Sequence, residues 1–343
     1  MQIRSLQYLR ALAALLVVSN HAILGVQGLS VSWRSDFGSA GVDIFFVLSG
    51  YIIYASQSAN RDIGDFAYRR LVRIIPLYWL ATAAFIALHL TAGIEPDAKL
   101  PLGHVIQSLL LIPHFSAQLP GEIYPVLPPG WTLSYEMFFY GLFALGLVLA
   151  PRRLAVFLTG VICALVVLGQ VLHLQQAVLA TYTKGILLEF VAGVIIAVAA
   201  ARRTPPRAAG VLVPVGLALI VMSLPGPRVL VWGAPAAMVV YGALALEPFA
   251  RPRWPVLLGN ASYAIYLIQF PLLPLLRSAW LGLGLTPDAL LFAAFAIPAC
   301  ALVGVAVHLA VEKPLLAWFK RSAPRTIRFF SAKPAVKAAI RPG

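Results

Sequence analysis

Long runs of apolar residues recur along the chain, and each run is ended by a short group of polar or basic residues. A helix that crosses the hydrocarbon core of a bilayer needs roughly 20 mostly apolar residues, with a range of about 17–25. The pattern predicts about ten such helices and therefore an all-α, polytopic membrane protein. The predicted spans are 6–26, 40–58, 74–90, 132–150, 154–174, 181–200, 209–224, 229–246, 256–280 and 289–311.

The composition is that of a chain lying mostly in lipid. Charged residues make up 11% of the 343 residues and hydrophobic residues 61%, whereas a soluble domain carries about 25% charged residues. The mean hydropathy is +0.88. A formal net charge of +14 would suit a nucleic-acid-binding protein, but here the basic residues lie in short segments between apolar runs. We therefore expect the lipid bilayer as a partner and no nucleic acid.

The basic residues lie mainly on one side of the predicted spans. That side holds Arg4, Arg61, Arg69, Arg70, Arg73, Arg152, Arg153, Arg202, Arg203, Arg207, Arg251, Arg253 and the basic residues from Lys313 to Arg341, whereas the other side holds Arg34, Lys99, Lys184, Arg228 and Arg277. Cytoplasmic segments of membrane proteins are enriched in Lys and Arg. The bias predicts that both termini lie in the cytoplasm, that the number of spans is even, and that the protein is a multi-pass protein of the inner membrane.

Two segments lie outside the predicted spans. Residues 91–130 form a long outer loop, and loops of this length are often functional. Residues 1–321 make up the predicted membrane domain, and the basic tail 322–343 has the composition of a disordered segment held near anionic lipid. No His or Cys residues have the spacing of metal ligands, so we expect no metal cofactor.

The first predicted span contains two residues that are costly inside a bilayer, Arg10 and His21. They are eleven residues apart, which on an α-helix places them on one face, about 16 Å apart along the axis. Asp43 and Glu136 enter the membrane at a depth similar to that of His21, and a histidine with a carboxylate partner is typical of general-base catalysis on a hydroxyl. We take these four residues as candidate catalytic residues. In the alternative interpretation, the two carboxylates cap helix starts and the histidine is structural.

Arg69, Arg70 and Arg73 gather at the cytoplasmic start of the third predicted span. The planar guanidinium group suits phosphate because it binds in a bidentate manner. Together with Arg10, these residues are candidates for holding the phosphates of coenzyme A, whose pantetheine arm is long enough to carry a thioester toward His21. Ordinary anchoring of a span by positive charge is the alternative.

Four segments resemble, in the same order, the motifs of acyltransferase family 3. They are Leu6-Gln7-Tyr8-Leu9-Arg10-Ala11-Leu12-Ala13-Ala14 with His21, Gly41-Val42-Asp43-Ile44-Phe45-Phe46-Val47-Leu48-Ser49-Gly50-Tyr51, Arg70-x-x-Arg73 followed by Pro76, Tyr78 and Trp79, and Trp131-Thr132-Leu133-Ser134-Tyr135-Glu136. The resemblance covers almost the whole chain. It implies ten spans, acyl-CoA as donor and O-acylation of extracytoplasmic glycans. It also implies that Arg10 and His21 are essential, that Arg70 and Arg73 contact acyl-CoA, and that Glu136 belongs to the active site.

The residues Ser134-Tyr135-Glu136 of the last motif and the short tail resemble those of the bacterial enzymes that acetylate exopolysaccharide or O-antigen. This implies acetyl-CoA as co-substrate and a polysaccharide or lipid-linked oligosaccharide as acceptor. We assign Trp131, Ser134 and Tyr135 to substrate binding on the same resemblance.

Two other functions remain open at the level of the sequence. Buried charges also suit a transporter or flippase for a glycan or a lipid-linked sugar, although the paired repeats and broken helices typical of such proteins are not evident. A partner subunit without chemistry of its own is the other possibility. Glu189 lies inside the sixth predicted span; Lys184 is its candidate partner, and we assign it no role at this level.

Overall fold

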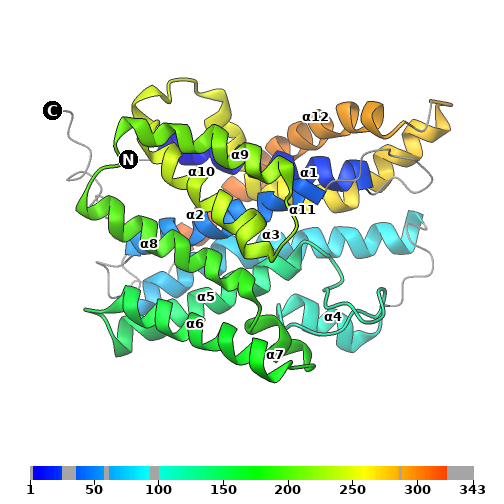
Figure 1. Cartoon of the computed structure of the whole chain (residues 1–343). Helices are drawn as coiled ribbons and strands as arrows, with labels where there is room; N and C mark the ends of the chain where they lie inside the picture. The colour runs from blue at the N-terminus through cyan, green and yellow to red at the C-terminus, as the bar shows by residue number, and fades with distance from the viewer. Residues whose placement is uncertain (1–2, 25–35, 58–61, 93–99, 286–287, 323–343) are drawn as a thin grey trace.

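The computed structural model describes residues 3–24, 36–57, 62–92, 100–285 and 288–322, and this part of the chain is helical, without a β-strand (Figure 1). The α-helices are α1 Arg4–Leu24, α2 Ala40–Gln57, α3 Ile63–Ala92, α4 Leu102–Leu109, α5 Gly130–Leu149, α6 Leu154–Leu172, α7 Ala177–Tyr182, α8 Leu188–Arg202, α9 Leu212–Met222, α10 Ala234–Ala245, α11 Trp254–Gly282, α12 Ala289–Val307 and α13 Lys313–Ser322. Short 3₁₀ or π turns cover Asp36–Ser39, Gly185–Leu187, Arg207–Val211, Val229–Gly233, Glu247–Phe249 and His308–Glu312.

Within the described residues, eight helices are long and apolar enough to cross a membrane. The seventh and eighth predicted spans correspond to two shorter apolar helical segments, Arg207–Met222 and Val229–Ala245. The prediction of an all-α, polytopic membrane protein is confirmed. The predicted tail lies outside the described residues beyond Ser322.

Two spans differ from their predicted form. Helix α3 begins at Ile63, eleven residues before the predicted start. The basic residues that precede the apolar run, which marked the predicted border of the span, lie inside the helix. Arg69, for example, pairs with Asp65 one turn earlier, at 2.5 Å. The sixth predicted span begins instead as the short helix α7, and α8 follows only after the turn Gly185–Leu187.

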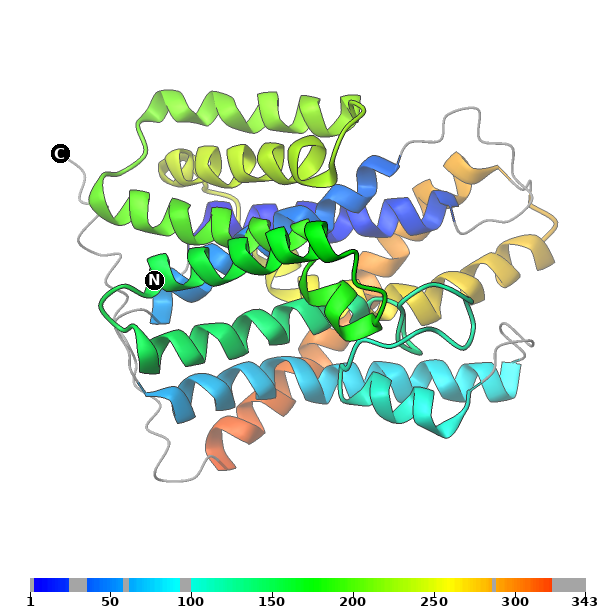
Figure 2. The same ribbon diagram turned by 60° about the horizontal axis from the view of Figure 1, so that its bottom comes forward.

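Helices α1 and α2 lie in the middle of the bundle (Figures 1 and 2), where α1 packs along α11 and α2 along α8. Glycines allow the close approach of α2 and α8. A Cβ added at Gly50 would lie 2.1 Å from the carbonyl oxygen of Phe190, and one added at Gly193 would lie 2.1 Å from that of Val47. Small residues at helix interfaces are typical of membrane bundles, and here they bring the aromatic side chains of both helices into contact.

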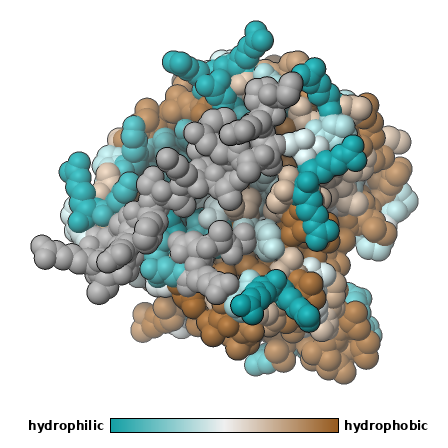
Figure 3. Space-filling view, turned by 90° about the vertical axis from the view of Figure 1, so that its left-hand side faces the viewer, coloured by the Kyte–Doolittle hydropathy of each residue, from teal (hydrophilic) through white to brown (hydrophobic). Residues whose placement is uncertain are grey.

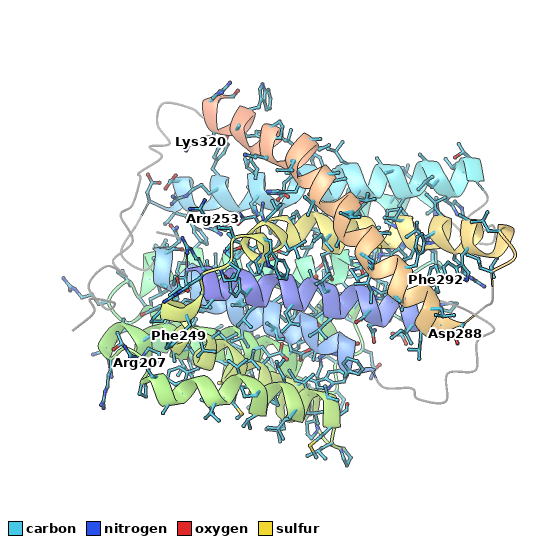
Figure 4. All side chains as sticks on the ribbon, turned by 90° about the horizontal axis from the view of Figure 1, so that it is seen from above. Arg207, Phe249, Arg253, Asp288, Phe292 and Lys320 are labelled. Carbon is cyan, nitrogen blue, oxygen red and sulfur yellow. The ribbon has the colours of Figure 1, made fainter. Side chains whose placement is uncertain are left out.

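The two ends of the bundle differ in charge. Figure 4 shows Arg207, Arg253 and Lys320 at one end, which we call the basic end, and Asp288 at the other. The chain begins at the basic end (Figure 1), and hydrophilic side chains gather there beside apolar flanks (Figure 3). Helices α4 and α7 lie toward the opposite end, which we call the loop end. The basic segments therefore collect at one end, and it remains a prediction that this end faces the cytoplasm.

Candidate active site

Glu136 lies inside α5 and is held by two hydroxyl groups. Ser49 of α2 donates a hydrogen bond to Glu136 Oε1 at 3.0 Å, and the Tyr140 hydroxyl, one turn further along α5, donates to the same oxygen. Glu136 does not cap α5, because that helix begins six residues earlier, at Gly130. Sequence reasoning missed both hydroxyls, although the i,i+4 spacing of Tyr140 from Glu136 was a usable signal.

The Glu136 side chain lines a cavity of about 150 Å³ between α1, α2, α3, α5 and α11, which we call the arginine cavity. Arg10 of α1 and both Arg70 and Arg73 of α3 also line it. Arg73 forms an ion pair with Glu312, and its guanidinium lies 5.5 Å from the centre of the Tyr263 ring. The structure therefore brings together residues that are far apart in the sequence.

The arginine cavity carries a surplus of positive charge. Three arginines line it, and two carboxylates, Glu136 and Glu312, lie close to them. Arg10 and Arg70 form no ion pair within the described part of the chain. Arg70 instead lies over the rings of Phe66 and Tyr140, at 5.8 and 5.9 Å. Two guanidinium groups without a carboxylate partner make this cavity a suitable site for an anion.

Arg69 does not join the other arginines. Its guanidinium pairs with Asp65 and donates a hydrogen bond to the side-chain oxygen of Gln57 at 2.9 Å, and it is not among the residues that line the arginine cavity. Its neighbour Arg70 points into that cavity, because successive residues of a helix point about 100° apart. Arg69 thus lies outside the arginine cavity, whereas Arg70 and Arg73 line it.

His21 lies in the last turn of α1 and packs edge-on against Phe270 of α11, with ring centroids 6.1 Å apart. It lines neither of the two cavities described here. Its ring interacts with the side chain of Gln269, which lies three residues beyond Tyr266, a residue that lines the arginine cavity. His21 Nδ1 is buried without a hydrogen-bond partner. His21 therefore lies just behind the lining of the arginine cavity, on the side toward the loop end.

The expected pair of His21 with a carboxylate is not formed. Glu136 is held by hydroxyl groups, and Asp43 forms a bidentate ion pair with Arg228, with N–O distances of 3.1 and 2.6 Å. Asp43 is fully buried, and its partner comes from the turn before the π-helical segment Val229–Gly233. This contact links that segment to α2.

Glu189 of α8 lies beside the ion pair of Asp43 and Arg228, and among the described residues it forms no ion pair with Lys184. Both of its carboxylate oxygens are buried without a hydrogen-bond partner. It is 1% exposed, and its electrostatic neighbours are Asp43 and Arg228. The Arg228 guanidinium also lies 4.8 Å from the centre of the Trp232 ring. Lys184 lines a different space, the second cavity.

The second cavity has a volume of about 430 Å³ and lies toward the loop end; we call it the outer cavity. Trp131, Ser134 and Tyr135, which the sequence assigned to substrate binding, line it together. The other polar residues in its lining are His114, Glu122, Tyr124, Gln170, Thr181, Lys184 and Arg228. Aromatic rings beside hydroxyl, amide and charged groups can hold a polar ligand with apolar faces, such as a sugar.

A pair of histidines supports the loop that lines the outer cavity. His114 Nε2 lies 2.7 Å from His104 Nδ1, and His114 Nδ1 lies 2.6 Å from the carbonyl oxygen of Ile112. Burial, together with the neighbouring His114, lowers the pKa of His104 below its ordinary value. Within the described residues, no three His, Cys, Asp or Glu side chains are grouped as metal ligands.

A family model and a relative each match most of this chain. The family described as "Acyltransferase domain" matches residues 3–309. The exopolysaccharide production protein ExoZ of Rhizobium meliloti (strain 1021) is 42% identical over 291 residues, which cover 81% of this chain and 90% of ExoZ. No solved structure matches the chain.

Two shorter similarities point to the same family. The putative peptidoglycan O-acetyltransferase YrhL of Bacillus subtilis (strain 168) is 39% identical over 84 residues, which cover 23% of this chain and 12% of YrhL. The acyltransferase MdmB of Streptomyces mycarofaciens is 31% identical over 122 residues, which cover 34% of this chain and 30% of MdmB.

Proposed function

Since this chain belongs to the acyltransferase family whose domain it matches from residue 3 to residue 309, we propose that it transfers an acetyl group from acetyl-CoA to a hydroxyl of an extracytoplasmic polysaccharide or of its lipid-linked precursor. The family membership makes the chain an acyltransferase and leaves the transporter and the inactive subunit without support. The acetyl-CoA donor, the polysaccharide acceptor and the location in the inner membrane are what we propose beyond the family.

One observation carries the proposal: the arginine cavity and the outer cavity lie on neighbouring faces of the first two turns of α5. An acyl transfer between a charged thioester donor and a glycan needs two sites that meet at one point. The arginine cavity offers a site for an anion. The outer cavity, on the side toward the loop end, offers aromatic and polar side chains for a sugar.

For the donor, Arg10, Arg70 and Arg73 would hold phosphates of coenzyme A, which enters from the basic end. The thioester would then lie deeper in the arginine cavity, near Glu136. The sugar hydroxyl attacks the thioester carbonyl, the C–S bond breaks and a C–O bond forms. The hydroxyl proton goes to the leaving thiolate, which departs as free coenzyme A, and we propose His21 as the general base that carries it. This role requires the His21 ring, which lines neither cavity in this conformation, to reach the hydroxyl.

For the acceptor, support comes from the relatives and from the outer cavity. ExoZ is named for exopolysaccharide production and YrhL for O-acetylation of peptidoglycan, so a polysaccharide is the acceptor class that we propose here. A volume of about 430 Å³ lies within the range of about 300–1,000 Å³ that is common for small-molecule sites. It can hold one part of a polymer whose remainder extends out of the loop end.

The test uses purified protein in lipid vesicles with acetyl-CoA and exopolysaccharide as the acceptor. We expect release of free thiol that depends on the acceptor, and acetyl ester on the polysaccharide by mass spectrometry. His21→Ala should remove both signals. If acetyl-CoA neither binds nor is consumed, the proposed donor is wrong, and if it is consumed without ester on the polysaccharide, the proposed acceptor is wrong.

A further inference from the structure

The start of α5 separates the two cavities. Thr132, Leu133 and Glu136 line the arginine cavity, whereas Trp131 and Tyr135 line the outer cavity. Their side chains alternate between the two spaces because successive residues of a helix point about 100° apart. A sugar in one cavity and a thioester in the other are therefore separated by this one layer of side chains.

Phe46 of α2 completes this layer. It lines the arginine cavity, and its ring contacts two rings of the outer cavity, Trp131 at 6.4 Å and Tyr135 at 5.9 Å between centroids. Trp131 and Tyr135 also contact each other, at 5.7 Å. We call these three residues the aromatic wall. Phe46 is 3% exposed, so the wall is closed to solvent at this ring.

The aromatic wall is held in place by a stack of rings behind it. Phe46 stacks on Phe190 of α8, with centroids 4.6 Å apart, and Phe190 stacks in turn on Phe139 of α5, at 4.7 Å. Phe139 is fully buried and lines neither cavity. The close contact of α2 and α8 at Gly50 fixes the distance at which these rings meet. The position of Phe46 is thus set by packing and not by a ligand.

We infer that Phe46 keeps water from the donor thioester, so that the acyl group passes to the acceptor hydroxyl rather than to water. This inference rests on the proposed function. In transfer, the C–S bond of the thioester breaks and the acyl carbon bonds to the sugar oxygen, which gives an ester and free thiol. In the competing reaction, a water oxygen takes the place of the sugar oxygen, and the products are a carboxylic acid and the same thiol.

The chemistry of the site makes this competition unavoidable. A base able to activate a sugar hydroxyl can also activate water, and exclusion of water from a closed site is a known way to prevent such side reactions. The outer cavity must admit a polar glycan and has polar lining residues, so it also admits water. An apolar barrier is needed between this cavity and the thioester until the acceptor is bound, and Phe46 lies at that position; the acceptor hydroxyl reaches the thioester when its sugar displaces this ring, which water alone does not do.

The experiment compares Phe46→Ala, Phe46→Leu and Phe139→Ala in lipid vesicles at matched protein amounts. Free thiol released from acetyl-CoA without acceptor measures hydrolysis, and acetyl ester formed with acceptor measures transfer. We expect the ratio of hydrolysis to transfer to rise several-fold in Phe46→Ala and to a smaller extent in Phe46→Leu. Phe139→Ala removes a ring of the same size from the same stack but opens neither cavity, so it should keep the wild-type ratio.

The outcomes separate the two claims. If transfer proceeds and both Phe46 variants keep the wild-type ratio, the role of Phe46 is refuted and the proposed function stands. If Phe139→Ala raises the ratio as much as Phe46→Ala does, loosening of the bundle explains the effect and the inference also fails. If Phe46→Ala does not fold, Phe46→Leu, which keeps an apolar side chain, decides the question. A wild-type protein that neither hydrolyses acetyl-CoA nor transfers the acetyl group refutes the proposed function itself, and this inference with it.

Discussion

Arg73 of α3 forms an ion pair with Glu312, which lies 239 residues later in the π-helical turn between α12 and α13. His308 contacts the other oxygen of the same carboxylate, at 2.7 Å. Glu312 therefore neutralises one of the three arginines of the arginine cavity. Arg10 and Arg70 form no ion pair among the described residues, and three arginines against Glu136 and Glu312 leave the cavity with a net positive charge that suits an anionic ligand.

Replacement of Arg70 by alanine should weaken the binding of coenzyme A. The loss of one hydrogen bond between charged groups is worth about 1.5–3 kcal/mol, which corresponds to a Kd roughly 10- to 150-fold higher. Titration calorimetry with coenzyme A and detergent-solubilised protein measures the change.

Arg69→Ala is the matched control, because it removes a neighbouring arginine that pairs with Asp65 outside the cavity. It should leave the Kd for coenzyme A near the wild-type value. Equal weakening by both variants would mean that the cluster acts only through general positive charge.

Glu136→Gln should lower turnover by about 10²–10⁴-fold if Glu136 takes part in proton transfer at the active site. Tyr140→Phe removes one of the two hydrogen bonds to this carboxylate and leaves that of Ser49, so its effect on turnover should be smaller. Initial rates of ester formation at saturating acetyl-CoA measure both. A Glu136→Gln protein with a wild-type rate would give this residue a purely structural role.

His21→Ala should abolish acetyl transfer and leave the Kd for coenzyme A largely unchanged, because His21 lines neither cavity while the arginines remain in place. The readouts are ester formation and calorimetry on the same preparation. His173→Asn is a suitable control: this histidine lies at the end of α6 with a left-handed backbone, which asparagine tolerates. Loss of coenzyme A binding in His21→Ala would point to a distorted fold rather than a missing base.

The loop that lines the outer cavity should loosen in acid. The folded-state pKa of His104 is lowered by burial and by His114, so unfolding takes up protons. The stabilising contribution of the neutral ring is then complete above the unfolded-state pKa of about 6.5 and is lost as the pH falls below that value. Hydrogen exchange over residues 102–126, corrected for the intrinsic rate, should be faster at acidic pH than at neutral pH.

The variant His104→Phe tests the source of this pH dependence. It removes the titrating ring and keeps an aromatic side chain of similar shape, so exchange over the same segment should depend less on pH. An unchanged dependence in this variant would assign the effect to another group.

Much of the fold was predictable because lipid imposes length and polarity on every span. The runs of apolar residues located α5 and α12 within a few residues. The start of α3 was predicted too late, because Arg69 and Arg73 look like the border that precedes the apolar span. The i,i+4 spacing of Asp65 and Arg69 did indicate a continuing helix, so this error was avoidable.

The site was predictable only in part. Motif residues identified Glu136 and Arg70, which line one cavity together with Arg10. His21, which helical spacing placed on the same face as Arg10, lines neither cavity. The pairing of Asp43 with Arg228 joins residues 185 positions apart in different helices, and no local pattern reports such a contact. The aromatic wall likewise depends on how α2 and α5 pack, which the sequence of either helix alone does not determine.

The central claim is acetyl transfer to an extracytoplasmic glycan with His21 as an essential residue. Mass spectrometry of surface glycan should be compared among cells that carry the wild-type protein, His21→Ala at equal membrane expression, or no protein. The account predicts an acetyl mass increment with the wild-type protein alone, on a glycan that reaches the surface in all three cell lines. A glycan that is exported only when the protein is present, and equally well with His21→Ala, would contradict it and indicate a transporter instead.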